Sequence, residues 1–214
     1  MQDGRAESIR SQRPSGCIGS GTEGKEGRQV LTDAIERNQL ENVRRLYEAS
    51  FPKSEKKPFA FILQKQKEGF FDILAIEDDQ GAFCGLAIMM LAGGLALLDY
   101  LAIDPDCQGG GIGSRTLAEL GERYGKERIV VEIESTAGDG DCAEGEPDGE
   151  GAQRLRRKAF YLRNGMVPMD YLVDLFGVEM EVLTFGRALT FEQYYAIYRE
   201  VLPKQMAGKI RLQP

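Results

Sequence analysis

The chain has 214 residues, 42% of them hydrophobic and 29% charged, which is typical of one soluble globular domain with a good-sized core. Its formal net charge of −7 disfavours nucleic acid and anionic membrane surfaces as partners. The chain has no histidine, and its four cysteines show no CxxC spacing. These absences exclude the usual Cys or Cys/His zinc sites, so we expect no metal, and they exclude His-based catalytic triads. Acid–base chemistry must then come from carboxylates, Tyr, Lys, Cys or water.

Residues 1–28 are rich in Gly, Ser and charge and show no periodicity, so we predict a flexible N-terminal tail. Gly19–Gly24 matches GxGxxG, but no strand precedes it, and a linker is the better interpretation. The N-terminus has no apolar segment of a secretory signal, and free thiols fit a reducing compartment. We therefore expect a cytoplasmic protein.

A short strand is predicted over Gln29–Ala34, and a helix follows with Asn38 as its N-cap. Pro58 suits the first position of a second helix that ends at Gly69. The apolar stretch Ala82–Ile103 is long enough to cross a membrane. Its central glycines and Asp99 favour a buried β-hairpin instead, after a strand over Phe70–Ile76.

The centre of the chain predicts a strand, a glycine loop, a helix and a second strand. The strand Leu95–Ile103 stops at Asp104-Pro105, and the loop Gln108–Ser114 leads into a helix over residues 112–124. The next apolar run, Ile129–Glu134, would pair in parallel with the first strand, because a helix joins the two. A glycine loop at a helix N-terminus presents free N–H groups and the positive end of the helix dipole, which favour a phosphate.

Residues 135–151 form an acidic, glycine-rich stretch that we predict to be a loop. Its acidic residues suggest calcium, but Ala143 occupies a ligand position of the EF-hand pattern, so a solvated loop is favoured. A helix over Ala152–Asn164 carries a basic cluster (Arg154, Arg156, Arg157 and Lys158), which we interpret as a solvated face.

Two antiparallel strands, Met166–Phe176 and Val178–Phe185, follow the basic helix. Thr190 and Gln193 then form a capping box for a last helix with an aromatic stripe. That stripe could serve the core or a homodimer interface. We divide the chain into the tail 1–28, a domain over 29–189, and a C-terminal helix and tail over 190–214.

These patterns resemble the GNAT superfamily of N-acetyltransferases. Its Q/R-x-x-G-x-G/A signature is met by Gln108, Gly111 and Gly113 after the strand ending Leu101–Pro105. A second signature, an aromatic-Tyr pair leading to a helix-ending glycine, is met by Phe160–Met166. The resemblance implies the GNAT fold of the α/β (α+β) class: a mixed, mostly antiparallel sheet with one parallel βαβ crossover, flanked by helices.

The resemblance also implies that the chain binds acetyl-CoA as acyl donor. The pyrophosphate would lie on the backbone N–H groups of the glycine loop. The pantetheine arm would fill a gap between two splayed strands, hydrogen-bonding the backbone there, and an N–H of the same strand would polarise the thioester carbonyl. The residues expected to bind the cofactor are Leu101, Ala102, Ile103, Gln108, Gly109, Gly110, Gly111, Ile112, Gly113 and Ser114.

For catalysis, the resemblance makes Tyr161 the general acid that protonates the departing thiolate, although a tyrosine there could also simply pack on the core. Glu132 and Glu134 lie two apart on one strand and therefore on one face, which makes both candidate bases, with Glu134 slightly preferred and Asp99 a third. Arg154 stands where the family often has an asparagine and could reach a CoA phosphate.

The sequence thus predicts an N-acetyltransferase in which a small-molecule or peptide amine attacks acetyl-CoA directly in a ternary complex. Acidic residues at the site would favour a cationic acceptor. The alternative is a non-catalytic acyl-CoA-binding regulatory module of the same fold. A nucleotide-binding protein is disfavoured because Ser114-Arg115 follows Gly113 where a P-loop has Lys-Ser/Thr.

Overall fold

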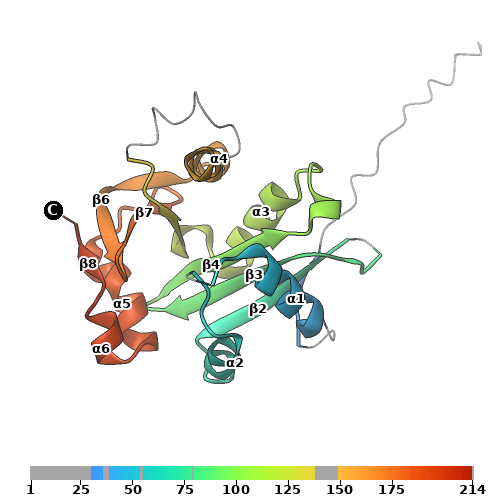
Figure 1. The fold of residues 1–214 in the computed structure, drawn as a ribbon, viewed down its shortest axis with the longest axis horizontal. Coiled ribbons are helices and arrows are strands. Elements are labelled where there is room, and N and C mark those ends of the chain that lie inside the picture. The colour runs from blue at the N-terminus through green and yellow to red at the C-terminus, as the bar shows by residue number, and fades with distance from the viewer. Residues whose placement is uncertain (1–29, 36–38, 54, 79, 138–148, 214) are drawn as a thin grey trace, which may run out of the picture.

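The computed structural model describes residues 30–35, 39–53, 55–78, 80–137 and 149–213. Figure 1 shows these residues folded around a central sheet with helices on both of its faces. The bounds of the elements, in chain order, are β1 Val30–Asp33, α1 Leu40–Ser50, α2 Phe59–Lys67, β2 Phe71–Glu77, β3 Phe83–Ala92, β4 Leu95–Ile103, η1 Pro105–Cys107, α3 Ile112–Tyr124, η2 Lys126–Arg128, β5 Ile129–Glu134, α4 Glu150–Arg163, β6 Val167–Leu175, β7 Val178–Thr184, α5 Phe191–Val201, α6 Lys204–Ala207 and β8 Arg211–Leu212.

The described strands form one eight-stranded sheet in the order β1-β2-β3-β4-β5-β7-β6-β8. Neighbouring strands are antiparallel except β4 and β5, which are parallel and joined through α3. This is the mixed sheet with a single parallel crossover that the sequence predicts, and the predicted fold class is confirmed.

Each face of the sheet carries its own hydrophobic core. The first core lies beneath α1, α2 and α5, with Tyr47, Ile62 and Tyr198 fully buried in it. The second core lies beneath α3 and α4 and includes Leu120 and Tyr161. Because side chains alternate along a strand, β5 contributes Val130 to the first core and Val131 and Ile133 to the second. Glu132 and Glu134 therefore share the face of the first core.

Several predicted elements are found at their predicted residues. The helix over 112–124, the strand Ile129–Glu134 and the hairpin partner Leu95–Ile103 match the structure. The hairpin turns at Gly93 and Gly94. Both have positive φ, and glycine is the residue that adopts positive φ readily at two consecutive positions. No helix in the described ranges is long and apolar enough to cross a membrane.

The N-terminal ends of two helices differ from the prediction. The N-cap of α1 is Gln39, without a side-chain capping bond, and Asn38 lies outside the described residues. Pro58 is the N-cap of α2 rather than its first residue, and its carbonyl accepts hydrogen bonds from Phe61 and Ile62. Both differences are one-residue shifts of a helix end, which local sequence defines only loosely.

The C-terminal segment contains more than the predicted helix and tail. The Thr190–Gln193 capping box begins α5 as predicted. Beyond α5, the short helix α6 leads to β8, which pairs with β6 at Val173 and Asp174. The segment thus adds a strand to the edge of the sheet. The tail 1–28, the Gly19–Gly24 motif and most of the acidic loop, including Ala143, lie outside the described residues.

Candidate active site

The parallel strands β4 and β5 separate after a short paired stretch. Their register covers three pairs, ending at Leu98 and Val131. Beyond that point β4 continues along β3 to Ile103, whereas β5 continues along β7 to Glu134. Within the described residues, the edge of β4 that faces β5 has no strand partner from there on. The sequence-based prediction of splayed strands is thus met by the strand pairing (Figure 1).

A β-bulge lies where the two strands begin to separate. Ile88 of β3 pairs with Tyr100, whereas its neighbour Met89 pairs with Leu98, which leaves Asp99 as the extra residue of β4. Bulges bend a strand and increase its twist. The bulge at Asp99 therefore accounts for the direction in which β4 leaves β5, and it lies at the base of the opening.

The glycine loop joins the open end of β4 to α3. Gln108 ends β4 by donating its side-chain Nε2–H to the carbonyl of Ile103, at 3.1 Å. Gly109 and Gly111 have φ values of 93° and 72°, and Gly111 is the left-handed N-cap of α3. The first backbone N–H of α3 that bonds within the helix is that of Arg115, to Gly111 O at 3.1 Å. The preceding amides of the first turn are those that a helix leaves available to an anion.

The loop has the open space that a phosphate cradle requires. A Cβ placed on Gly109, Gly110 or Gly111 would meet no atom within 4 Å. By contrast, a Cβ on Gly113 would lie 3.2 Å from the ring of Phe160, so this glycine lets α3 approach α4 closely. The residues present therefore fit a pyrophosphate at the loop and an extended chain along β4.

A cleft of about 400 Å³ opens between β4 and β5. Acidic, basic and apolar side chains from both halves of the sheet share its wall, with Glu132 on one side and Tyr161 on the other. The lining residues are Phe51, Glu55, Lys56, Lys57, Leu98, Asp99, Tyr100, Leu101, Glu132, Glu134, Arg157, Tyr161, Leu175, Phe176, Val178 and Met180.

Tyr161 reaches this cleft from α4. Its side chain belongs to the second core, and the residue is only 7% exposed. The ring packs edge-on against Phe160, with centroids 5.0 Å apart. Burial raises the pKa of Tyr161 to about 12, with a smaller opposing effect of Arg157. The hydroxyl is therefore protonated at neutral pH, as a proton donor must be.

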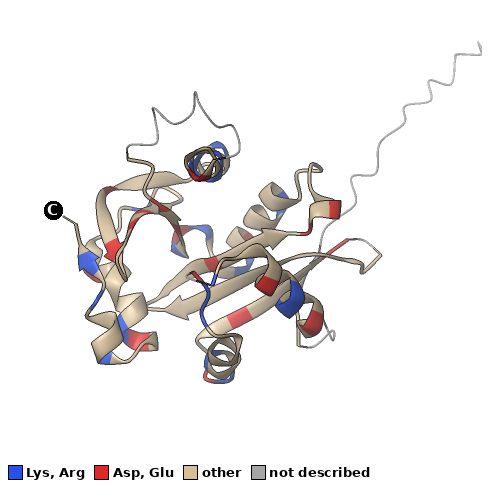
Figure 2. Cartoon of the chain, in the orientation of Figure 1, with Lys and Arg blue, Asp and Glu red and all other residues tan. Residues whose placement is uncertain are grey.

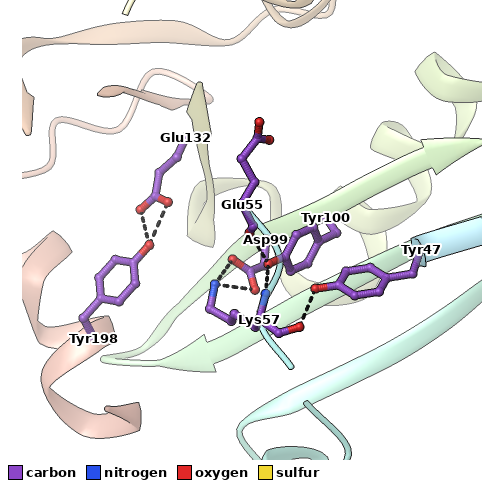
Figure 3. Close-up of polar contacts among 7 residues, drawn as sticks. All are labelled: Tyr47, Glu55, Lys57, Asp99, Tyr100, Glu132 and Tyr198. Atoms are coloured by element: carbon purple, nitrogen blue, oxygen red, sulfur yellow. Dashed lines mark hydrogen bonds and ion pairs between the residues drawn. The ribbon is translucent and has the colours of Figure 1, made fainter. Parts of the chain in front are cut away.

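Glu132 lines the cleft from β5, and its carboxylate is bound by a tyrosine. Both carboxylate oxygens accept from the Tyr198 hydroxyl at 2.7 Å (Figure 3). Burial raises the pKa of Glu132, while the hydroxyls of Tyr194 and Tyr198 oppose that rise. A carboxylate with a raised pKa is a stronger base than an exposed one, provided that it is deprotonated at the working pH.

The other two candidate bases are each paired with a cation. Asp99 accepts from Lys57 Nζ at 2.7 and 2.9 Å, and its side chain is 6% exposed. Glu134 lies 3.5 Å from Arg154 Nη1. Each of these two carboxylates already has a cationic partner, whereas no described cation is paired with Glu132. The geometry therefore favours Glu132 over Glu134, which the sequence slightly preferred.

Arg154 and its basic neighbours on α4 face the sheet more than the sequence suggested. Arg154 contacts Glu134, Arg157 lines the cleft, and Lys158 Nζ lies 2.7 Å from Glu181 of β7. The interpretation as a solvated helix face was therefore wrong for Arg154 and Lys158, whereas Arg157 is exposed at the rim of the cleft. Figure 2 shows Lys and Arg interspersed with Asp and Glu across the described part of the chain.

The structure adds residues that sequence reasoning did not assign to the site. Lys57 and Glu55 come from the segment between α1 and α2, and Tyr100 fixes that segment. Its hydroxyl donates to Glu55 O at 2.9 Å and accepts from the backbone N–H of Lys57 at 3.0 Å. Tyr198 comes from α5, where its helical spacing indicated a position in the core or at a homodimer interface. Nothing local in the sequence marks these contacts, because they join residues 43 to 66 apart.

Comparisons with known proteins bear on this site. The profile of the Acetyltransferase (GNAT) family matches residues 40–139. A Bacteroides thetaiotaomicron protein provisionally described as a GNAT-family acetyltransferase has a similar structure, with a TM-score of 0.60 and 22% identity over 81% of this chain and 95% of its own. No curated protein matches the sequence significantly.

Spermidine N-acetyltransferase from Vibrio cholerae is also similar in structure. Its complex with CoA and spermine gives a TM-score of 0.51 and 16% identity, covering 72% of this chain and 93% of the other. Its dodecameric form gives a TM-score of 0.52 and 14% identity, covering 72% and 91%. At such identities these likenesses show the fold alone. Together with the family match over residues 40–139, they agree with the resemblance to the GNAT superfamily that the sequence motifs indicate.

Proposed function

We propose that this acetyltransferase transfers an acetyl group from acetyl-CoA to a cationic amine by direct attack in a ternary complex. The observation that carries the proposal is the cleft where β4 and β5 separate, which Glu132 and Tyr161 both line. These two residues belong to opposite faces of the sheet, and the opening lets them act on one reaction centre.

The glycine loop and the open edge of β4 support the choice of donor. Available amides at the start of α3 and open space over Gly109–Gly111 suit a pyrophosphate. The unpaired edge of β4 over Leu101–Ile103 suits an extended amide-containing chain that adds to the sheet as a strand would. Acetyl-CoA, when bound, supplies an acetyl group activated as a thioester.

The residues around the cleft would move two protons. Glu132 accepts a proton from the acceptor ammonium, which frees the nitrogen lone pair to form the new C–N bond. A backbone N–H of β4 stabilises the charge that develops on the carbonyl oxygen. Tyr161 donates its proton to the sulfur as the C–S bond breaks, and water restores the tyrosine proton.

The charges of the cleft support a cationic acceptor. Four carboxylates line it, and two of them are neutralised: Asp99 by Lys57 and Glu134 by Arg154. Glu55 and Glu132 make no ion pair with a described residue, although Arg157 lies close enough to Glu55 to lower its pKa. Burial and the charge of Glu134 raise the pKa of Glu55 overall. An incoming ammonium would relieve this excess of negative charge.

Thermal-shift titration tests the choice of donor. Acetyl-CoA at about 100 times its Kd should stabilise the protein by about 2.7 kcal/mol, and ATP should not. Stabilisation by ATP alone would overturn the assignment. Gly111→Glu should remove the acetyl-CoA effect because it places a negative charge in the cradle, and unchanged binding would show that the loop is not the site.

A panel of amines tests the reaction. Free CoA should form with polyamines, aminoglycosides or amino groups of peptides, and more slowly with neutral or anionic amines. CoA is best measured by chromatography, since the chain's own four cysteines could react with thiol dyes. No release with any amine, although acetyl-CoA binds, would contradict the proposed transfer.

A further inference from the structure

The C-terminal helix α5 carries a side chain that hydrogen-bonds to Glu132, the candidate base. This helix lies outside the segment matched by the family profile. The profile ends at residue 139, whereas α5 spans Phe191–Val201. The capping box at Thr190 fixes where this helix starts, and Tyr194, Ile197, Tyr198 and Val201 form its buried face. Three of these four side chains pack in the first core next to the sheet with no exposed surface, and Val201 is 2% exposed.

Tyr198 is well placed to hold Glu132. The tyrosine is fully buried, and its hydroxyl lies 2.7 Å from both oxygens of the carboxylate. A hydroxyl has one proton, so it donates to the carboxylate and keeps it in one orientation. Tyr198 is not among the residues that line the cleft, so it would act through Glu132 rather than on the acceptor.

The C-terminal part of α5 is anchored to the β3–β4 hairpin. Glu200 accepts from the backbone N–H of Gly93 at 3.0 Å, and a Cβ on Gly93 would lie 3.3 Å from Ala196. The helix therefore packs closely on the β3–β4 turn while Tyr198 reaches β5. These contacts tie α5 to strands on both sides of the opening.

We propose that Tyr198 is a positioning residue that holds the Glu132 carboxylate toward the acceptor side of the cleft, which makes α5 a working part of the catalytic apparatus. The proposal rests on the proposed function, in which Glu132 is the base. A purely structural tyrosine would need only its ring in this core. The hydroxyl, placed on both carboxylate oxygens, is what a role in orienting the base requires.

Other titratable groups also surround Glu132. Tyr194 lies on the same helix as Tyr198, and Tyr171 lies on β6. Asp99 of β4 and Lys57, which precedes α2, also act electrostatically on the Glu132 carboxylate. Asp99 raises the pKa of Glu132 and Lys57 lowers it, so this ion pair has opposing effects. The Tyr198 hydroxyl stabilises the charged carboxylate, and its removal should raise that pKa.

Tyr198→Phe in the full chain tests the proposal. The acidic limb of the kcat–pH profile should shift upward by about one pH unit, and kcat at neutral pH should fall about tenfold, because a hydrogen bond to a charged group is lost. The Kd of acetyl-CoA should stay unchanged. Tyr195→Phe, on the same helix with its ring stacked on Phe191, is the matched control and should behave as the wild type. An unshifted limb in Tyr198→Phe, or an equal shift in the control, would overturn the proposal.

A second measurement separates this inference from the proposed reaction. The side-chain carboxyl of Glu132 can be followed by ¹³C NMR, with its signal assigned from Glu132→Gln. Its titration midpoint should rise in Tyr198→Phe whether or not an amine is acetylated. An unchanged midpoint would refute the positioning role. A shifted midpoint without any acetyl transfer would support the effect of the Tyr198 hydroxyl on Glu132 and refute only the role of Glu132 as base.

Discussion

Glu132 combines two properties that a folded protein rarely brings together without a function. It is a carboxylate in a largely buried position, and among the described residues no cation is paired with it. Burying a charge in this way is unfavourable unless hydrogen bonds compensate, and Tyr198 compensates only in part. Glu132 should therefore promote catalysis while lowering the stability of the folded protein.

Replacement of Glu132 by Gln should lower turnover about 100-fold, the usual contribution of a general base. The same change should stabilise the protein at pH 8. The folded state raises this pKa above its unfolded value of 4.5, so it holds the proton more tightly. Wild-type stability therefore falls as pH rises from 4.5 through the raised value, and the glutamine variant lacks this loss.

Urea unfolding at pH 4.5, 6 and 8 measures the stability difference, which should widen with pH. Glu134→Gln is the matched control, because Glu134 lies on the same strand and face but pairs with Arg154. A difference that is the same at every pH would contradict the burial argument. Loss of turnover in the control alone would identify Glu134 as the base.

Tyr161→Phe should lower kcat about 100-fold while the Kd of acetyl-CoA stays the same, because only the donated proton is lost. The ring would keep its contact with Phe160, so the melting temperature should change little. Steady-state kinetics and calorimetric titration measure the two quantities. Equal kcat in the variant would leave Tyr161 as a core residue only.

At the residue scale, the sequence suggested the candidate acid and base residues but not the side chains that contact them. Tyr161 and Glu132 follow from a motif and from strand alternation, which are local features. The partners of those residues are not local. Arg154 meets Glu134, and Tyr198 meets Glu132 across 66 positions, so only the folded chain shows which carboxylate remains without a cation.

Among the elements, the glycine loop has the most exacting geometry. Gly109 and Gly111 need positive φ, whereas Gly110 does not, and a Cβ on Gly110 would meet nothing. Gly110→Ala should therefore leave the melting temperature of the free protein unchanged. The new methyl group should still hinder the approach of a phosphate to the amides.

Calorimetric titration of Gly110→Ala should show a Kd for acetyl-CoA about ten times that of the wild type, the effect of weakening one hydrogen bond to a charged group. Gly113→Ala provides the contrast, since its methyl group would press on Phe160 and through it on Tyr161. That variant should lose turnover more than affinity. Wild-type affinity in Gly110→Ala would place the phosphates elsewhere.

Elements with a strong periodic pattern were predicted to within a residue, and those without one were not. Helix α3 and strand β5 are bounded by Gly111, Gly125 and an apolar run, and their ends match. Helix α1 has Gln39 as its N-cap without a side-chain capping bond, so the capping pattern predicted at Asn38 did not locate its start. Strand β8 has two residues, Arg211 and Leu212, too few for any alternation to appear.

On the scale of the whole molecule, the C-terminal segment belongs to the structural core. Residues from Leu189 onward supply a substantial share of the first core. They are Leu189, Tyr194, Ile197, Tyr198, Val201, Leu202, Ala207 and Ile210. The sequence predicted a C-terminal helix and tail after residue 189 and left open whether its aromatic stripe serves the core or an interface; the packing places that stripe in the first core.

A chain ending at residue 185 should therefore lose cooperative thermal unfolding, because burying each large apolar side chain contributes about 1.5–3 kcal/mol. A chain ending at residue 210 is the control. It retains Ile210 and loses only β8 and the bond from Gln213 N–H to Leu172 O, so it should melt within a few degrees of the full chain. Calorimetry decides between the two, and a cooperative transition in the shorter chain would contradict the packing argument.

The two ends of the sheet also bear on how copies of the chain behave at high concentration. One outer strand, β1, has four residues and the other, β8, has two. Beneath β8, strand β6 carries Pro168 beside a break in its register. Short outer strands and an edge proline give a second molecule little backbone to pair with, which opposes aggregation by strand addition. Any assembly of these chains should therefore form through side-chain surfaces, leaving each sheet separate.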